Sequence, residues 1–395
     1  MQALTRLSSN DTHAVKLHRK IKIGFFSAYP PDRGRLSEYA EMLVKNLVKR
    51  YPNVLVTVYT DHPSARGDGN VRMVYAWRFN NLFSLLKSIP RIVRDRNRIL
   101  IFNVHFAVFG RSRLVNFVGF LTIFLYKLLG IIFKYKTIVI LHNVPEAIKI
   151  ETVGLRWSLI NRIGFLIAEK LILFSDVVVV LMRSYVRMLK HRFNANVVFI
   201  PHGAWTWNLS KPVRSGRNAI VFIGYLSPTK DLGVLVEAFK RLRRKFSFLE
   251  LVIAGSPHPN FPETAYMLDS IGDIEGVRVY GYVPDENIPR ILRRALAVVL
   301  PYKTATGTSG VLHLVSGAAI PVVAPRLKEF RELLLEGAGI VSCNLSPSGL
   351  EDVLTRLIID EEYWLKLALR SLKFAEERSW ERVADEFYKL FIVLS

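Results

Sequence analysis

The sequence is poor in cysteine and in acidic side chains. Cys343 is the only cysteine among 395 residues, so no disulfide can form within the chain, which fits a reducing compartment. The 33 Asp and Glu residues are outnumbered by 55 Lys and Arg residues, and the formal net charge is +22. Such a positive field favours an anionic partner: a nucleic acid, an acidic membrane surface or a phosphorylated substrate.

Other absences narrow the possible functions. The sequence has no His/Cys cluster with metal-ligand spacing, so we expect no metal site. It shows no helix-turn-helix, zinc-finger or aromatic RNA-binding pattern, and its basic residues are scattered through both halves. We therefore expect no specific nucleic acid partner. Residues 1–20 lack the apolar core of a signal peptide, and we expect them to form a flexible leader.

Short β-branched runs alternate with amphipathic helices from Ile21 onward. Continuous apolar strands separated by helices are typical of a parallel sheet that is covered on both faces. Before residue 201 the runs predict strands at 21–28, 53–60, 99–105, 137–142, 177–181 and 197–200. After residue 218 they predict strands at 219–224, 250–254, 277–281, 297–300 and 321–324.

The stretch 201–218 is rich in Pro, Gly and polar residues and interrupts this alternation. It predicts a boundary between two doubly wound, Rossmann-like α/β domains, at 21–205 and 206–378, followed by an amphipathic helix at 379–395. Ligands of such sheets bind beyond the carboxyl ends of the strands. We therefore expect the functional site in the cleft between the domains.

The segment 114–133 is apolar almost all round, and as a helix it would reach about 30 Å, enough to span a bilayer. The strands predicted on either side of it belong to one sheet, which argues against a span. A small or polar stripe could pack on the protein: Asn116, Gly119, Thr122, Tyr126 and Gly130. We expect segment 111–136 to lie on an anionic membrane surface, with contacts from Phe117, Phe120, Phe124, Lys127 and Leu128. The alternative is a buried core helix.

A Gly/Thr/Ser loop at 306–310 follows a predicted buried strand and precedes a helix that opens at about Ser309. Its backbone N–H groups are free, and nothing bulky stands at Gly307 or Gly310, so a phosphate can bind there. The alternative is an ordinary strand-to-helix turn. Lys230, just before another helix, would complete a diphosphate clamp, although a single Lys in that position is usually solvated.

Two first-domain loops face the same predicted cleft. PDRGR (31–35) follows the first strand, and LHNVPE (141–146) ends a later strand with His142. A single His at a strand end is more often structural than catalytic. Together with the second-domain loops, however, these segments form an ordered set.

In order and spacing this set resembles the retaining glycosyltransferases of family 4, which have the GT-B fold. The resemblance extends from Ile21 to the C-terminus. It rests on VVFIPHG, VFIGYLSPTKDLGVLVEAF, ELVIAGS, VRVYGYVP, LPY…GTSGVL…PVVA and SWERVADEFYKLF. It implies transfer of a sugar from a nucleotide-diphosphate donor with retention of anomeric configuration, and a C-terminal helix that crosses back to the first domain.

The resemblance also implies roles for individual residues. Gly34 would lie against the donor phosphates, His142 would contact the transferred sugar, and Lys230 would neutralise the leaving diphosphate. Tyr282 and Val283 would border the base. The loop amides that would hold phosphate oxygens are those of Gly307, Thr308, Ser309, Gly310 and Val311.

The sequence departs from the family pattern at four positions. Tyr225 replaces the arginine that usually joins the lysine, and Asp231 replaces the glycine after it. Thr306 and Leu314 stand near the places of two glutamates, of which the first normally contacts the sugar and the second the ribose. These departures put the identity of the sugar and catalytic competence in question.

The leading prediction is a metal-independent hexosyltransferase without a cofactor, peripherally bound at the cytoplasmic face of the cell membrane. Its donor would be a GDP- or UDP-linked sugar, and its acceptor a lipid-linked or surface glycan. One alternative is a nucleotide-sugar epimerase, which needs cleft carboxylates, and the loops offer only Asp32, Glu146 and Asp231. The other is a non-catalytic, degenerate GT-B protein that associates with a membrane or a nucleic acid.

Overall fold

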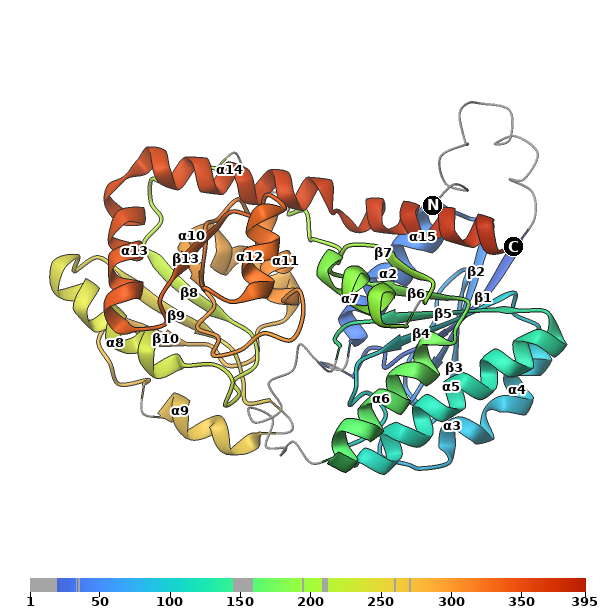
Figure 1. Ribbon diagram of the computed structural model, residues 1–395. Coiled ribbons are helices and arrows are strands. Elements are labelled where there is room, and N and C mark those ends of the chain that lie inside the picture. Colours follow the sequence, from blue (N-terminus) through green and yellow to red (C-terminus); the bar gives the residue numbers. More distant parts are fainter. Residues whose placement is uncertain are drawn as a thin grey trace.

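The computed structural model describes residues 20–32, 34, 36–144, 159–193, 195–207, 212–258, 261–269 and 271–395. Nearly all of the predicted leader, and Glu146, lie outside these residues. The described chain forms two parallel sheets with helices on both faces of each (Figure 1). The predicted α/β fold is confirmed.

The first sheet has seven strands in the order β3-β2-β1-β4-β5-β6-β7, and every neighbouring pair is parallel. The central strands are buried on both faces, as their continuous apolar runs predict. The strands are β1 (Ile21–Phe26), β2 (Val54–Thr60), β3 (Val71–Tyr75), β4 (Ile99–Val104), β5 (Lys136–Leu141), β6 (Val177–Val180) and β7 (Val197–Phe199).

Helices cover both faces of this sheet. One face carries α2 (Ser37–Arg50), whose apolar side chains pack with residues of β1, β2 and β4. The other face carries α3 (Ser84–Lys87), α4 (Ile89–Asp95), α5 (Arg113–Phe133), α6 (Leu159–Leu173) and α7 (Arg183–Phe193).

The second sheet has six strands in the order β10-β9-β8-β11-β12-β13, again all parallel. They are β8 (Ala219–Ile223), β9 (Glu250–Ala254), β10 (Val277–Val279), β11 (Ala295–Val299), β12 (Val322–Pro325) and β13 (Ile340–Cys343). The helices are α8 (Leu232–Lys245), α9 (Tyr266–Asp269), α10 (Ile288–Arg294), α11 (Gly310–Ser316), α12 (Lys328–Leu335), α13 (Pro347–Ile359) and α14 (Glu361–Glu377), with short 3₁₀ turns at Pro262–Ala265 and Asp285–Asn287.

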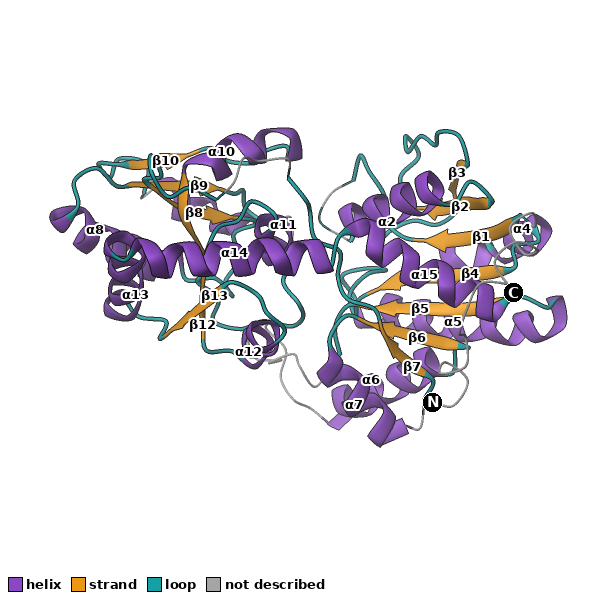
Figure 2. Ribbon diagram, turned by 90° about the horizontal axis from the view of Figure 1, so that it is seen from above, coloured by secondary structure: helices purple, strands orange, loops and turns teal. Residues whose placement is uncertain are grey.

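The C-terminal helix α15 (Trp380–Leu394) leaves the second domain and packs on the first, as the resemblance implies (Figures 1 and 2). Its apolar face enters the core formed by α2 and the first sheet, through Trp380, Val383, Ala384, Phe387 and Phe391. Tyr388 stacks on Tyr51 with ring centres 3.6 Å apart, and Asp385 accepts hydrogen bonds from Arg50 and Tyr51.

Helix α5 corrects two of the membrane predictions. Phe120 is buried in the core against Phe106 and Phe109, because it lies on the same helical face as Asn116 and Ile123. Lys127 is not available to lipid phosphates, because its Nζ donates to Asp176 Oδ1 at 2.7 Å. The predicted small and polar stripe is confirmed, since all five of its residues are buried.

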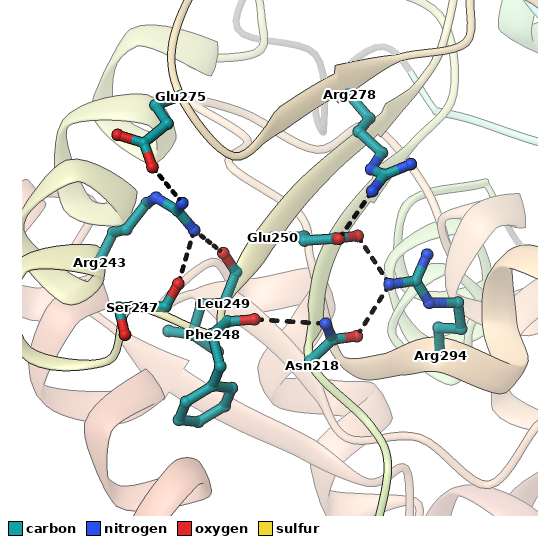
Figure 3. Close-up of polar contacts among 9 residues, drawn as sticks. All are labelled: Asn218, Arg243, Ser247, Phe248, Leu249, Glu250, Glu275, Arg278 and Arg294. Carbon is teal, nitrogen blue, oxygen red and sulfur yellow. Dashed lines mark hydrogen bonds and ion pairs between the residues drawn. The ribbon is translucent and has the colours of Figure 1, made fainter.

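The amino ends of the second-sheet strands are held by paired charges (Figure 3). Glu250 accepts hydrogen bonds from Arg278 at 2.9 Å and from Arg294 at 2.8 Å. Arg243 donates to Glu275 at 2.7 Å and to two backbone carbonyls. Two carboxylates therefore pair with three arginines at this end of the second domain.

Candidate active site

A cavity of about 620 Å³ lies between the carboxyl ends of the two sheets. Loops after β1 and β5 form one wall, and loops after β8, β9 and β11 form the other. The cavity lies between the domains, where the sequence analysis expects the functional site. The structure brings together all residues predicted for catalysis and donor binding: Gly34, His142, Tyr225, Lys230, Tyr282, Val283, Thr306, Gly307, Thr308, Ser309, Gly310 and Val311.

Lys230 is a partly buried cation in the wall of this cavity. Its Nζ donates to the backbone carbonyl of Tyr225 and lies 5.3 Å from the ring centre of Tyr302. Among the described residues no carboxylate forms an ion pair with it, and burial lowers its pKa to about 8. A buried charge without a counter-charge is costly, so this position is suited to an anionic ligand.

The neighbouring Asp231 is committed elsewhere. Its Oδ1 accepts a hydrogen bond from Val234 N at 3.2 Å and so caps α8. Its Oδ2 lies 3.2 Å from Nζ of the half-exposed Lys303. Asp231, which replaces the family glycine, therefore caps α8 and pairs with Lys303. It does not neutralise Lys230.

The loop 306–310 faces Lys230 with unused donors. Within the described part of the chain, the backbone N–H groups from Gly307 to Val311 make no hydrogen bond, and α11 begins at Gly310 as predicted. A Cβ at Gly307 would lie 2.8 Å from the carbonyl oxygen of His142. Only glycine therefore allows the loop to approach the first domain so closely.

Gly34 closes the cavity from the first domain. Its φ of 85° favours glycine, and a Cβ there would lie 3.0 Å from Cε2 of Tyr225 in the second domain. Its N–H donates to both carboxylate oxygens of Glu38, at 3.1 and 3.3 Å. A phosphate that used this amide would have to displace Glu38.

Comparisons with known proteins agree with this geometry. Residues 217–360 match the family described as Glycosyl transferases group 1. This match covers most of the second domain, and the two Rossmann-like domains together have the GT-B fold.

Two curated relatives of this GT-B chain are mannosyltransferases. The phosphatidyl-myo-inositol mannosyltransferase of Mycolicibacterium smegmatis is 24% identical over 46% of each chain. The O-antigen chain mannosyltransferase B of Escherichia coli is 24% identical over 44% of this chain and 45% of its own. The chain thus spans about half the length of the curated relatives it matches.

A solved structure shows the same fold over nearly the whole chain. The sucrose-phosphate synthase of Thermosynechococcus elongatus superimposes with a TM-score of 0.71 at 14% identity. The match covers 95% of this chain and 99% of that one.

The imidazole ring of His142 is neutral, with one nitrogen as a hydrogen-bond donor and the other as an acceptor. Its Nε2 lies 2.7 Å from Asn103 Oδ1, and Asn103 Nδ2 donates to Ser27 Oγ and to the carbonyl of Leu36. This network assigns the proton to Nε2 and leaves Nδ1 as an acceptor. Burial, with the nearby His202 and His105, holds the pKa of His142 well below its usual range.

Sequence reasoning missed two further histidines that line the cavity, His105 and His202, and a third, His313, that contacts the loop 306–310. His313 Nε2 lies 2.7 Å from Thr308 Oγ1, and the His313 ring stacks on His202 at 4.7 Å. His202 in turn contacts Tyr39, which packs against His142 at 4.6 Å. These rings connect the donor loop to the first domain. The only sequence signal was the PHG tripeptide at 201–203.

The positions of the two missing glutamates carry no carboxylate. The carbonyl of Thr306 accepts a hydrogen bond from the hydroxyl of Tyr185 at 3.1 Å, which ties the loop to α7. Leu314 presents an apolar side chain to the cavity. Among the described residues that line the cavity, Glu38 is the only carboxylate. Among the described residues, the positions of the two family glutamates therefore contribute no acidic group to the cavity.

Proposed function

We propose that the protein is a retaining hexosyltransferase that takes its sugar from a GDP- or UDP-linked donor. The observation that carries this proposal is Lys230, a partly buried cation without a carboxylate partner in the described chain, which lines the same wall of the cavity as the unpaired amides of loop 306–310. One point charge and several fixed N–H groups suit a diphosphate. The family match and the mannosyltransferase relatives support the same reading.

The proposed chemistry follows from where charge develops. Breaking the bond between C1 of the sugar and the phosphate oxygen leaves negative charge on the diphosphate. Lys230 and the loop amides would stabilise that charge more strongly in the transition state than in the ground state. Because these groups already supply the positive charge, we propose a reaction that is independent of a metal.

Retention would arise from attack on the face that the phosphate leaves. The acceptor hydroxyl gives its proton to the departing phosphate oxygen as its own oxygen bonds to C1. This route needs no pair of carboxylates, in contrast to most glycoside hydrolases. The neutral His142, with Nδ1 as an acceptor, is suited to hold a hydroxyl of the transferred sugar.

We further propose a lipid-linked or surface-glycan acceptor at the cytoplasmic face of the cell membrane. Among the described helices, α5 alone is long and apolar enough to cross a membrane, but only 39% of its most apolar window is buried inside the protein. Its exposed side chains include Leu128, Ile131 and Ile132, and α6 adds Ile163 and Ile167. Such a surface is typical of a helix that lies in the membrane interface.

The membrane proposal predicts a loss of vesicle binding when the exposed end of α5 becomes polar. Leu128→Ser/Ile131→Ser/Ile132→Ser should bind anionic vesicles at least about tenfold more weakly, because each change removes apolar surface from the interface. Co-sedimentation at two salt concentrations measures the effect. The matched control, Phe248→Ser/Leu335→Ser/Ile359→Ser, removes three exposed apolar side chains from the second domain. Equal losses in both variants would contradict the proposal.

A donor panel tests the enzyme itself. The protein is incubated with GDP-mannose, GDP-fucose, UDP-glucose and UDP-N-acetylglucosamine in the presence of a membrane lipid extract. We expect one donor to yield free nucleoside diphosphate together with labelled lipid or glycan, and NMR of the product to show a retained anomer. Epimerised donor without acceptor would support the epimerase. Binding of nucleotide without turnover would support the non-catalytic reading, which the missing glutamates favour.

A further inference from the structure

A second cavity, of about 880 Å³, lies at the end of the first domain that is remote from the interdomain site. The C-terminal ends of α4 and α5 form its walls, next to the residues that lead into β4 and β5. Four cationic residues line it: Arg94, Arg96, Arg98 and Lys134. No acidic residue contributes to its described lining.

None of these four cations pairs with a carboxylate among the described residues. At the amino ends of the second-sheet strands, in contrast, Glu250 and Glu275 pair with three arginines: Arg243, Arg278 and Arg294 (Figure 3). In the first domain, the nearest carboxylate in sequence, Asp95, is taken by Arg72 at 2.7 Å and by the hydroxyl of Tyr59 at 2.6 Å. Among the described residues, none pairs with the four cations of the cavity.

Helix ends alone do not account for so much charge. Arg96 and Lys134 are the left-handed cap residues of α4 and α5, where a cation is favourable because each helix end carries roughly −0.5 charge. Two helix ends therefore offset about one of the four positive charges. The cavity stays strongly positive, and an anion is the ligand that its chemistry fits.

The rim of the cavity adds an apolar surface. Phe133, which lines the cavity, is 51% exposed, and Ile131 and Ile132 beside it are 66% and 69% exposed. A soluble phosphate compound or a nucleic acid backbone would leave these side chains in water. A phospholipid would cover both features, because it joins a charged phosphate to an acyl region.

We propose that this cavity binds the headgroup phosphate of an anionic phospholipid while the adjoining end of α5 enters the acyl region. The proposal rests on the membrane association proposed above but not on the transfer reaction. It adds that membrane attachment requires anionic lipid and that one cavity of the first domain recognises the charge of this lipid. It also fixes the α5 end of the first domain to the bilayer.

The test compares two variants that lose the same net charge. Arg94→Gln/Arg98→Gln removes two cavity cations, whereas Lys240→Gln/Arg244→Gln removes two exposed cations of α8 that have no partner in the described chain. Each is measured with vesicles of phosphatidylcholine alone and with 30% phosphatidylglycerol. We expect the cavity variant to bind the anionic vesicles about thirtyfold more weakly than the wild type, since each basic residue near such a surface contributes roughly a factor of five. The control should change little.

Several results would overturn the proposal. Equal losses in the two variants would show general attraction by net charge. Binding of glycerol 3-phosphate by the wild type without vesicles, lost in the cavity variant while both proteins bind anionic vesicles equally, would show a site for a small soluble phosphate. Weaker binding of a labelled single-stranded RNA by the cavity variant, with vesicle binding intact, would show a nucleic acid site. Nucleotide binding in the interdomain cavity should be equal in all variants, so failure here is separable from failure of the proposed enzyme.

Discussion

Replacing Lys230 by methionine is expected to lower kcat/KM for the nucleotide sugar by about 10²–10³. Methionine keeps the length of the side chain but removes the charge that meets the leaving diphosphate. Steady-state assays of nucleoside diphosphate release measure the effect. Lys303→Met is the matched control, because Lys303 is half-exposed and pairs with Asp231 rather than facing the cavity. A Lys230→Met enzyme with unchanged kcat/KM would contradict the assigned role.

The same substitution should stabilise the empty protein, by about 1–2 kcal/mol near pH 7, because it removes a partly buried charge that lacks a counter-charge. Burial lowers the pKa of Lys230 to about 8, below its value in the unfolded chain. The cost of burying the charge is therefore complete below pH 8 and is relieved as the pH rises from 8 toward 10.5. Urea unfolding across this range should show the stability difference between wild type and variant shrinking with pH.

Gly203→Ala is expected to destabilise the protein by about 3 kcal/mol. A Cβ at this position would lie 2.2 Å from Cδ2 of Trp380, and the Trp380 ring is buried between the domains. The ring cannot retreat, because it also packs against Tyr39, His202 and Trp205. The added methyl group must therefore displace the start of α15.

Chemical denaturation of Gly203→Ala, followed by tryptophan fluorescence, measures this loss. Gly164→Ala is the control, because a Cβ there meets no atom within 4 Å and alanine favours the helix α6. The control should be as stable as the wild type or slightly more stable. Equal stability of the two variants would show that the Trp380 contact can relax.

The sequence predicted the central strands and two of the four edge strands, β7 and β10. The edge strands β3 and β13 escaped prediction, and β3 buries only Val74 in full. A half-exposed strand carries polar residues that break the apolar run. The apolar runs of the central strands are continuous, and the predicted ends of these strands differ from the observed ends by no more than two residues.

Side-chain contacts between distant segments were beyond sequence reasoning. The ion pair of Lys127 with Asp176 joins residues 49 positions apart, and no local sequence pattern around either residue indicates its partner. The same holds for the stack of His313 on His202. The position of Phe120, in contrast, follows from its spacing of four residues from Asn116, so the helical period could have placed it in the core.

Helix α15 has a consequence for how the chain is made. Residues 380–394 complete the hydrophobic core of the first domain, yet they leave the ribosome after the entire second domain. Until α15 is made, the part of the α2 and sheet surface that α15 covers stays exposed in the first domain, while the second domain can fold around its own core. We therefore expect the domain made first to be the one that finishes folding last.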